Sequence, residues 1–365
     1  MKATLTTLLA LAMLSGTAFA AGVFVPTVVD GIGTPDAPYY YGVYSESAPV
    51  NANVTIREDA SGTTQTDYYI WGGYSEGDDY CNADYNTVTM TGGQVHDIIV
   101  GEVWFGGASN NTLVMTGGIA DSMVEVAANY YENDGQHGEV AHVDNNVAIL
   151  TGGNVDGDLI VAYGYGDSTV NNNQLHLVGA GAGEVSIGGV TYEHTDDISL
   201  GDVAVAKAGE GVTAENNSID IYGAGIEATS LSGFDKLNFH MVDGLTTSDT
   251  PMVSVAGELD LSQLTASINL FGDAVTNWSA FEGQEITLAS ATDGIIRPDF
   301  MTTEEEKYSI LDASGATVAT ATLRVVGYEM CPQSIVMSNI QGVPEPTTGT
   351  LSLLALAGLC IRRRK

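Results

Sequence analysis

The chain has 365 residues, 44 of them glycine, and a formal net charge of −35 at pH 7. A surface this acidic repels nucleic acid and anionic lipid, which excludes a function that depends on binding either of them. The hydrophobic content of 44% is enough for a sizeable core and excludes a disordered chain. Between the termini no segment keeps apolar residues at helical spacing over several turns, so we expect an all-β protein.

Residues 1–20 have the pattern of a removable export signal. Lys2 supplies the positive charge, residues 5–14 are apolar, and Ala18 and Ala20 provide the small residues of a cleavage site. The apolar run is too short to span a bilayer, which disfavours the alternative of an N-terminal membrane anchor. We therefore expect a signal peptide and an exported protein.

A short phrase recurs along the middle of the chain: it begins with Asn, alternates apolar and polar residues, and ends in small residues. Alternation over about five residues, bounded by Asn and Gly, predicts one half-buried strand per copy. The unequal spacing of the copies indicates a unit of about 25 residues that accepts insertions. The copies read NTVTMTGG (86–93), NTLVMTGG (111–118), NVAILTGG (146–153), NQLHLVGAG (173–181) and NSIDIYGAG (217–225).

A second, more apolar phrase fills each interval, so one unit is a strand, a glycine turn, a second strand and a loop. An isolated pair of strands is marginal in water, and the units must therefore stack on one another as a β-solenoid. Residues 39–44 and 53–56 are degenerate copies of the second and first phrases. The second phrase reads YIWGGYS (69–75), IIVGEVWFGG (98–107), MVEVAA (123–128), LIVAYGYG (159–166) and VAVA (203–206).

These patterns divide the chain beyond the signal peptide. Terminal repeats are usually atypical, which makes residues 21–60 an N-terminal cap. Residues 61–245 hold the β-solenoid repeats, and within them the acid-rich segment 76–85 is expected to be a surface loop. After Gly225 the register drifts, and residues 246–340 are predicted to form a C-terminal β cap, with strands in 267–271, 284–289, 308–311 and 320–326.

Asn pairs stand at the start of four of the five predicted strands. Asn tolerates the left-handed backbone conformation and caps turns, so stacked Asn residues are expected to hydrogen-bond from one unit to the next. This role is structural, without chemistry. The pairs are Asn110-Asn111, Asn145-Asn146, Asn172-Asn173 and Asn216-Asn217.

The C-terminus, residues 341–365, combines a short polar motif, an apolar run over 351–361 and a basic end. The motif is Val343, Pro344, Glu345, Pro346, and the basic end is Arg362, Arg363, Arg364, Lys365. The apolar run is short for a spanning helix, but it could insert transiently with the basic cluster on the cytoplasmic side. The alternative is a stray tail anchor.

These three parts resemble the PEP-CTERM sorting signal of Gram-negative bacteria. The resemblance implies recognition of Pro344, Glu345 and Pro346 by an exosortase-type sorting enzyme, a tail held transiently in the inner membrane as a transmembrane helix, and delivery to the cell surface or an extracellular polysaccharide matrix. It covers about the last 23 residues, counted from Val343.

The body is similar to the passenger domains of autotransporter and other adhesin-like proteins. Residues 86–93, 71–75 and 234–239 carry this resemblance. It implies a right-handed parallel β-helix displayed outside the cell. The sequence departs from that family because no membrane β-barrel translocator follows, since only about a hundred residues remain.

Three kinds of candidate site are weighed. Acid clusters at Asp78-Asp79 with Asp84, at Asp156-Asp158 and at Asp196-Asp197 could bind calcium, but none fits a calcium-binding loop, and turn acids on a solvated surface are the preferred interpretation. The histidines have no metal-binding spacing; only His137 and His142 could meet at a loop. No catalytic, cofactor or metal site is therefore predicted. The histidines are His96, His137, His142, His176, His194 and His240.

Cysteine usage is sparse. Cys360 lies in the C-terminal tail, which leaves Cys81 and Cys331 as a potential disulfide in an oxidising compartment. Their positions toward opposite ends of the predicted solenoid argue against a bond, because bridged Cα atoms lie within about 7 Å.

The sequence predicts an exported surface or matrix-associated protein that is structural or adhesin-like and is not an enzyme. Aromatic side chains in its turns would stack on polysaccharide or contact a neighbouring cell. The alternatives are a polysaccharide-active enzyme, a glycosidase or lyase with an acid pair in one insertion loop, and an inert matrix component. A lyase acting on uronates would need Lys or Arg, and residues 58–206 contain neither. The aromatic residues are Trp71, Trp104, Phe105, Tyr130, Tyr131, Tyr163 and Tyr165.

Overall fold

Strands make up nearly all the regular structure. The computed structural model describes residues 26–30, 39–45, 48–57, 68–76, 81–130, 140–209, 212–247, 250–262, 264, 268–297, 305–327 and 332–343. Among these residues, only η1 (Asp243–Thr247) and η2 (Trp278–Phe281) are helical, each a short 3-10 turn. The prediction of an all-β protein is confirmed.

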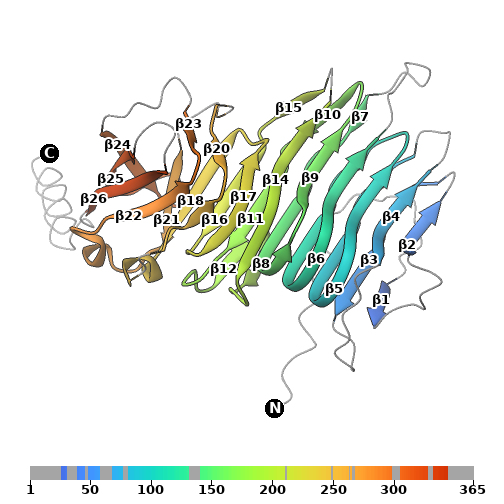
Figure 1. Ribbon diagram of the computed structural model, residues 1–365, viewed down its shortest axis with the longest axis horizontal. Coiled ribbons are helices and arrows are strands. Elements are labelled where there is room, and N and C mark those ends of the chain that lie inside the picture. The colour runs from blue at the N-terminus through green and yellow to red at the C-terminus, as the bar shows by residue number, and fades with distance from the viewer. Residues whose placement is uncertain are drawn as a thin grey trace, which may run out of the picture.

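The first phrase of each repeat forms a parallel ladder along the long axis of the molecule (Figure 1). Its strands pair in the following order, β5 and β6 contributing their N-terminal halves: β1 (Pro26–Asp30), β3 (Asn53–Arg57), β5 (Thr87–Val103), β6 (Thr112–Asn129), β8 (Val147–Val155), β11 (Gln174–Val178), β16 (Ser218–Tyr222), β18 (Lys236–Val242), β21 (Asn269–Ala274) and β24 (Glu306–Leu311).

The second phrase forms another parallel ladder, to which β5 and β6 contribute their C-terminal halves. Its further strands are β2 (Tyr39–Ser45), β4 (Tyr69–Ser75), β9 (Asp158–Gly164), β14 (Ile198–Ala208), β17 (Ile226–Ser232), β20 (Glu258–Asp260) and β23 (Gly294–Ile296). The predicted glycine turn between the two phrases does not interrupt the strands in β5 and β6, but Gly93 and Gly118 have a positive φ at this point. Each runs on as one strand, and Gly92-Gly93 and Gly117-Gly118 lie where the register shifts.

Smaller groups of strands complete the repeats. The N-terminal part of β14 pairs with the end of β8, and β17 pairs with β19 (Val253–Val255), which pairs with β22 (Ile286–Ala291). A separate three-stranded parallel sheet holds β7 (Ala141–His142), β10 (Ser168–Asn171) and β15 (Thr213–Glu215). An antiparallel hairpin is formed by β12 (Val185–Ile187) and β13 (Val190–Tyr192).

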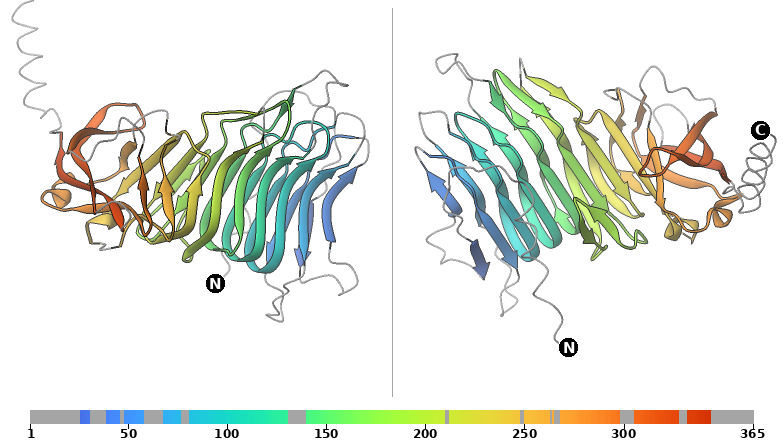
Figure 2. Two further views of the ribbon diagram at one scale, coloured as in Figure 1. Left: turned by 45° about the horizontal axis from the view of Figure 1, so that its top comes forward. Right: turned by 180° about the vertical axis from the view of Figure 1, so that it is seen from behind.

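The pairing becomes antiparallel at the C-terminal end, where β25 (Thr317–Val326) lies between β24 and β26 (Gln333–Gly342), and β26 also pairs with β22. Figure 2 shows these strands turned across the end of the parallel stack. They belong to the same 21-stranded sheet as the ladders. The C-terminal cap is therefore not a small sheet of its own, which was one possible form of the prediction.

The register places equivalent residues of successive repeats on top of one another, which explains the repeated phrase. One interior column is entirely buried and aliphatic. Burying one such side chain contributes about 1.5–3 kcal/mol. Residues of both ladders belong to one hydrophobic cluster, so the ladders pack face to face. The column runs Val54, Val88, Leu113, Ala148, Leu175, Ile219 and Leu237.

The predicted asparagine ladder is confirmed. Asn86, Asn111, Asn146, Asn173 and Asn217 are buried, and the Oδ1 atom of each accepts a backbone N–H from the preceding repeat at 2.8–3.0 Å. The partner Asn at the start of each pair has a left-handed backbone, with φ between 58° and 63°. Each pair therefore combines one turn residue with one inward-pointing residue that links the repeats.

Candidate functional site

A row of aromatic rings crosses β2 and β4 on the outer side of the second ladder. Tyr41 stacks on its register partner Trp71 with ring centroids 5.1 Å apart, and Tyr44 lies against its partner Tyr74 at 5.6 Å. Tyr41 is 41% exposed and Tyr44 is 43% exposed. Solvent-facing aromatic surface of this kind has an apolar body and polar edges, as recognition surfaces require.

Glycine sets the spacing of this row. In β4 the residues alternate between half-buried and buried up to Trp71, then Gly72 and Gly73 are both buried, and Tyr74 turns outward again. A Cβ atom on Gly73 would lie 2.2 Å from Oδ1 of Asn86. Only glycine fits there, and the double step brings two aromatic residues three positions apart onto the same face.

The rows continue onto β5 and β6 with glutamates. Tyr74 is in register with Glu102, and Trp71 is in register with Ile99, which pairs with Glu125. The indole Nε1–H of Trp71 donates to Oε2 of Glu102 at 2.6 Å. Glu102 thus takes the place that Tyr74 holds one repeat earlier, and Glu125 takes the place that Trp71 holds two repeats earlier.

Glu125 is buried and is hydrogen-bonded by an aromatic residue. It is 1% exposed, and its Oε2 accepts a hydrogen bond from the hydroxyl of Tyr130. Its other oxygen, Oε1, is buried without a hydrogen-bond partner. Tyr130 packs against Tyr163 on β9 at a centroid distance of 5.1 Å. A buried carboxylate oxygen without a partner is costly when ionised, so this environment favours the neutral acid.

Burial shifts the acidity of both glutamates in the same direction. It raises the pKa of Glu102 to about 7, although the hydrogen bond from Trp71 opposes the rise. It raises the pKa of Glu125 to about 8, with the Tyr130 hydroxyl acting in the opposite direction. The pKa of Tyr130 is also raised, by burial first and then by Glu125. Both carboxyl groups therefore favour the neutral form more strongly than a free glutamate does.

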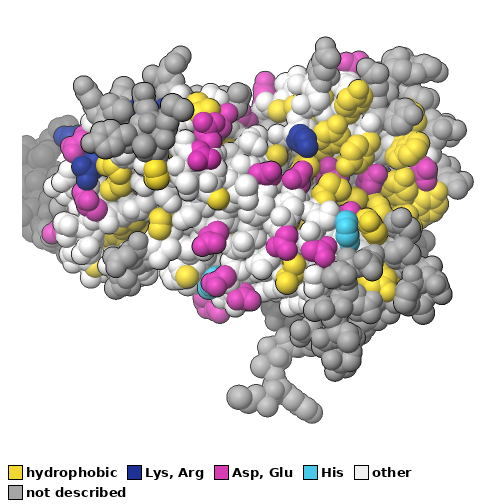
Figure 3. All heavy atoms as spheres, in the orientation of Figure 1, with side chains coloured by type: hydrophobic (Ala, Val, Ile, Leu, Met, Phe, Trp, Pro, Cys, Tyr) yellow, Lys and Arg dark blue, Asp and Glu magenta, His cyan; other side chains and the backbone are white. Residues whose placement is uncertain are grey.

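We call this region the aromatic–carboxylate face. Figure 3 shows hydrophobic side chains gathered over the N-terminal strands, with acidic side chains among them. The face spans β2, β4, β5, β6 and β9, and its last rung pairs Tyr163 with Lys207 of β14. It consists of Tyr41, Tyr44, Trp71, Tyr74, Glu102, Glu125, Tyr130 and Tyr163.

Of the aromatic residues proposed from the sequence, Trp71, Tyr130 and Tyr163 lie on this face. Trp104 adjoins it, because its side chain hydrogen-bonds that of Tyr74. Phe105 follows Trp104 in the bend after β5, and Tyr165 follows β9 and is exposed. Tyr131 lies outside the described residues.

Sequence reasoning missed Tyr41, Tyr44, Tyr74, Glu102 and Glu125. The tyrosines carried a usable signal, since 39–44 was already aligned with 69–75. The glutamates also carried one: each is a single acid within an apolar strand segment. The acid pair considered for an enzyme was placed in insertion loops, whereas the two carboxyl groups with raised pKa values lie within strands.

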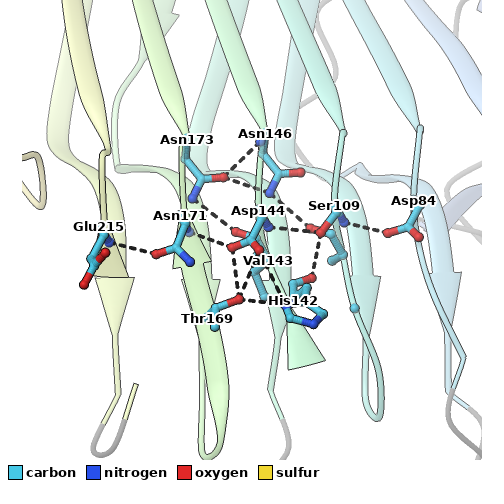
Figure 4. A network of polar contacts seen from close by, with 12 residues as sticks. Asp84, Ser109, His142, Val143, Asp144, Asn146, Thr169, Asn171, Asn173 and Glu215 are labelled. Atoms are coloured by element: carbon cyan, nitrogen blue, oxygen red, sulfur yellow. Dashed lines mark hydrogen bonds and ion pairs between the residues drawn. The ribbon is translucent and has the colours of Figure 1, made fainter. Parts of the chain in front are cut away.

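The candidate acid Asp84 and a further acid, Asp144, each accept a backbone N–H group. Asp84 Oδ1 accepts the N–H of Ser109 at 2.7 Å, and Asp144 Oδ1 accepts that of Asn171, also at 2.7 Å. Figure 4 shows this second polar ladder beside the asparagine ladder. Asp78 and Asp79 lie outside the described residues. No group of three or more His, Cys, Asp or Glu side chains in the described ranges could hold a metal ion.

The remaining acid clusters are separate. Asp156 begins the bend between β8 and β9, and Asp158 is the first residue of β9. In the other cluster, Asp196 Oδ1 accepts the backbone N–H of Asp197 at 2.9 Å. Both clusters lie outside the aromatic–carboxylate face.

The histidines are distributed over the fold. His142 contacts Thr169, His96 contacts Asp97, and His194 contacts the backbone of Val178. The other two described histidines, His176 and His240, lie on neighbouring strands on either side of Asp220. His137 is outside the described residues, so its meeting with His142 is untested.

The segment 76–85 is only partly as expected. Cys81 and Ala83 are buried, and their backbone N–H groups bond to Phe105 and Gly107 in the next repeat. The surface-loop prediction is therefore wrong for this part, because the turn stacks as a regular rung. Cys81 is reduced, and Cys331 is outside the described residues.

The targeting residues lie almost wholly outside the described part of the chain. This applies to Ala18 and Ala20, to Pro344, Glu345 and Pro346, and to the basic end Arg362, Arg363, Arg364 and Lys365. Val343 is described: it is exposed, follows β26, and donates its N–H to Val318 at 2.8 Å. Within the described ranges, the search for a membrane-spanning helix finds none of sufficient length and apolarity.

Comparison of the chain with protein-family models, with curated proteins and with solved structures finds no match.

Proposed function

We propose that this chain is an exported structural or adhesin-like protein, sorted by its PEP-CTERM-like tail to the cell surface or extracellular matrix of a Gram-negative bacterium. In this proposal the stacked repeats are a right-handed parallel β-helix, and the rod presents the aromatic–carboxylate face to polysaccharide. Support for the β-helix comes from in-register parallel pairing between strands that start 25 to 44 residues apart.

The observation that carries the binding role is the exposed aromatic row. Tyr41 and Tyr44 are among the large hydrophobic side chains that remain exposed, although Tyr41 stacks on Trp71 and Tyr44 lies against Tyr74. Phenol and indole rings pack against the apolar faces of sugar rings, while their polar edges hydrogen-bond hydroxyl groups. Several weak contacts in one row add up along a polymeric ligand.

The sorting role is supported by the position of Val343. This first residue of the motif is exposed and directly follows β26. The partners in this proposal are an exosortase-type sorting enzyme and, transiently, the inner membrane. Nucleic acid is excluded as a partner by the net charge.

Intact-mass measurement of the protein from fractionated host cells tests the proposal. We expect a species in the surface or matrix fraction that lacks residues 1–20 and the residues after the Pro-Glu-Pro motif. A full-length chain that stays in the inner membrane would contradict sorting. The protein would then be an anchored rod facing the periplasm.

One observation favours a second function, a polysaccharide-active enzyme. Glu102 and Glu125 form a buried carboxyl pair with raised pKa values, and a general acid in glycoside hydrolysis has this property. Release of reducing ends from polysaccharides, lost in a Glu125→Gln variant, would establish it. Polysaccharide binding without any release of reducing ends would contradict the enzyme and would support a rod that only binds polysaccharide.

A further inference from the structure

Two donors of the aromatic–carboxylate face are directed toward its own carboxyl groups, and the hydroxyl of Tyr44 donates to Oε2 of Glu76 at 3.2 Å. The indole N–H of Trp71 donates to Glu102, and the hydroxyl of Tyr130 donates to Glu125. Glu102 is 9% exposed and Glu125 is 1% exposed. A ligand therefore meets aromatic rings first, with two acids directly beneath them.

The Oε1 atom of Glu125 shows which charge state of this acid the face favours. It is buried and accepts no hydrogen bond, whereas Oε2 is bonded by Tyr130. An ionised carboxylate in this position would leave half of its charge without a partner, which costs several kcal/mol in a protein interior. The face is built for a carboxyl group that stays neutral, and it resists added negative charge.

The charge surrounding the face acts in the same direction. Residues 58–206 contain no Lys or Arg, and they include β4, β5, β6 and β9. Lys207, a cation that adjoins the face, is exposed on β14 in register with Tyr163. The acid at the edge of the face is Glu76, whose Oε2 accepts the hydroxyl of Tyr44. Two like charges 4 Å apart near a protein surface repel by about 4 kcal/mol. An acidic polysaccharide brings such a charge with many of its sugar units.

We infer that the ligand of the aromatic–carboxylate face is an uncharged polysaccharide of the extracellular matrix, and that chains of uronic acids or sulfated sugars are rejected. The inference rests on the proposed glycan-binding role and adds the chemical class of the ligand. The rings of Tyr41, Tyr44 and Trp71 supply the stacking surface. Glu102 and Glu125 are positioning residues that fix Trp71 and Tyr130.

Isothermal titration calorimetry on the exported chain at pH 6.5 tests the inference. The uncharged probes are hydroxyethylcellulose, galactomannan and xyloglucan, and the acidic probes are alginate and polygalacturonate. We expect binding to at least one uncharged polymer, and affinity at least about tenfold weaker for both acidic polymers, a difference of about 1.4 kcal/mol.

A double variant, Tyr41→Ala with Tyr44→Ala, locates the site. Both side chains are exposed, so their removal leaves the core intact. We expect a loss of affinity of about tenfold or more. Tyr308→Ala is the matched control, because Tyr308 lies on β24 at the C-terminal end and should change affinity less than about twofold. Circular dichroism verifies that each variant is folded.

The outcomes separate the inference from the proposed function. Alginate or polygalacturonate binding as tightly as the uncharged polymers, with loss in the double variant, would overturn the inference and keep the glycan-binding role. Equal losses of polysaccharide affinity in the double variant and in Tyr308→Ala would show that the binding site is not at the aromatic–carboxylate face. Absence of binding to all five polymers would overturn both the inference and the glycan-binding role.

Discussion

Asn146 donates two hydrogen bonds to a single atom of Asn173: its backbone N–H and its side-chain Nδ2 lie 2.9 and 3.0 Å from Oδ1. Asn173 repeats the arrangement toward Asn217, at 3.0 Å for both bonds. The ladder therefore satisfies the buried backbone at each turn by means of the next repeat. Sequence repetition and stability have the same physical origin here.

Substitution of Asn173 by alanine should be strongly destabilising. The change removes the acceptor of two buried donors of Asn146, and each buried donor left unsatisfied costs about 1–3 kcal/mol. We expect urea-induced unfolding to show a loss of about 2–4 kcal/mol in the free energy of unfolding.

The neighbouring Asn172 gives the control. Its φ of 58° is left-handed, which glycine adopts freely, so Asn172→Gly should change the free energy of unfolding little. Asn172→Val should cost about 1–2 kcal/mol, because a β-branched residue is strained there. Equal costs for Asn173→Ala and Asn172→Gly would contradict the ladder.

Much of the fold could be predicted because the repeat is written in local sequence. Asn and Gly mark the turns, and alternation assigns the side chains of each first phrase to the interior. The structure pairs Val88 with Leu113 and then Ala148, the register that alignment of the phrases gives. Parallel pairing between successive repeats is what stacking predicts for units that cannot be stable alone.

The candidate site could be predicted only in part, because the alternation of inward and outward residues is interrupted within the site. Counting by twos from Trp71 places Tyr74 in the interior, but Gly72 and Gly73 are both buried and reverse the phase. The burial of Glu125 depends on Tyr130, which lies beyond the end of β6, and on Tyr163 of the next repeat. No pattern within one phrase shows such a contact between repeats.

Stability should fall as pH rises through the range in which Glu125 ionises. Its pKa is raised from 4.5 to about 8 in the folded protein, so the contribution of the neutral acid is present at low pH and is lost as pH rises. The charged or titratable groups that affect it are Tyr130, Glu102, Asp97 and Lys207. Between pH 6.5 and 8.5 we expect the free energy of unfolding to drop by about 2 kcal/mol.

Urea unfolding of the wild type and of Glu125→Gln at these two pH values measures this drop. Glutamine keeps the size and an acceptor for Tyr130 but has no proton to lose. We therefore expect a clearly smaller decline in Glu125→Gln, the remainder coming from Glu102, whose pKa is raised to about 7. A decline as large in the variant as in the wild type would show that Glu125 is not its source.

Gly73→Ala on β4 should destabilise the protein, because the added Cβ atom clashes with the asparagine ladder. The new Cβ atom would lie 2.2 Å from Oδ1 of Asn86, which accepts the N–H of Ala52. Relief of the clash requires movement of a buried ladder residue, and we expect a loss of about 1–3 kcal/mol. Gly117→Ala is the control, because its nearest contact is the Thr91 carbonyl oxygen at 3.3 Å. Similar thermal unfolding midpoints for the two variants would contradict the close approach.

Asp220 on β16 should be essential to the stability of the C-terminal half of the stack. Ser218 and Asn238 donate to its carboxylate at 3.0 and 2.9 Å, and Nε2 of His240 lies 2.9 Å from it. Burial alone would raise the pKa of Asp220, but the hydrogen bond and charge of His240, with the charge of His176, outweigh it and lower that pKa. The carboxylate therefore stabilises the fold above the ordinary pKa of 3.8, and this contribution disappears as pH falls below it.

Asp220→Ala leaves all three partners unsatisfied and should cost about 3–5 kcal/mol at pH 7, whereas Asp220→Asn keeps one acceptor and should cost less. Chemical unfolding at pH 7 and pH 3 measures both, and a wild type that loses no more stability than Asp220→Asn on acidification would rule out this carboxylate as an acid-sensitive support.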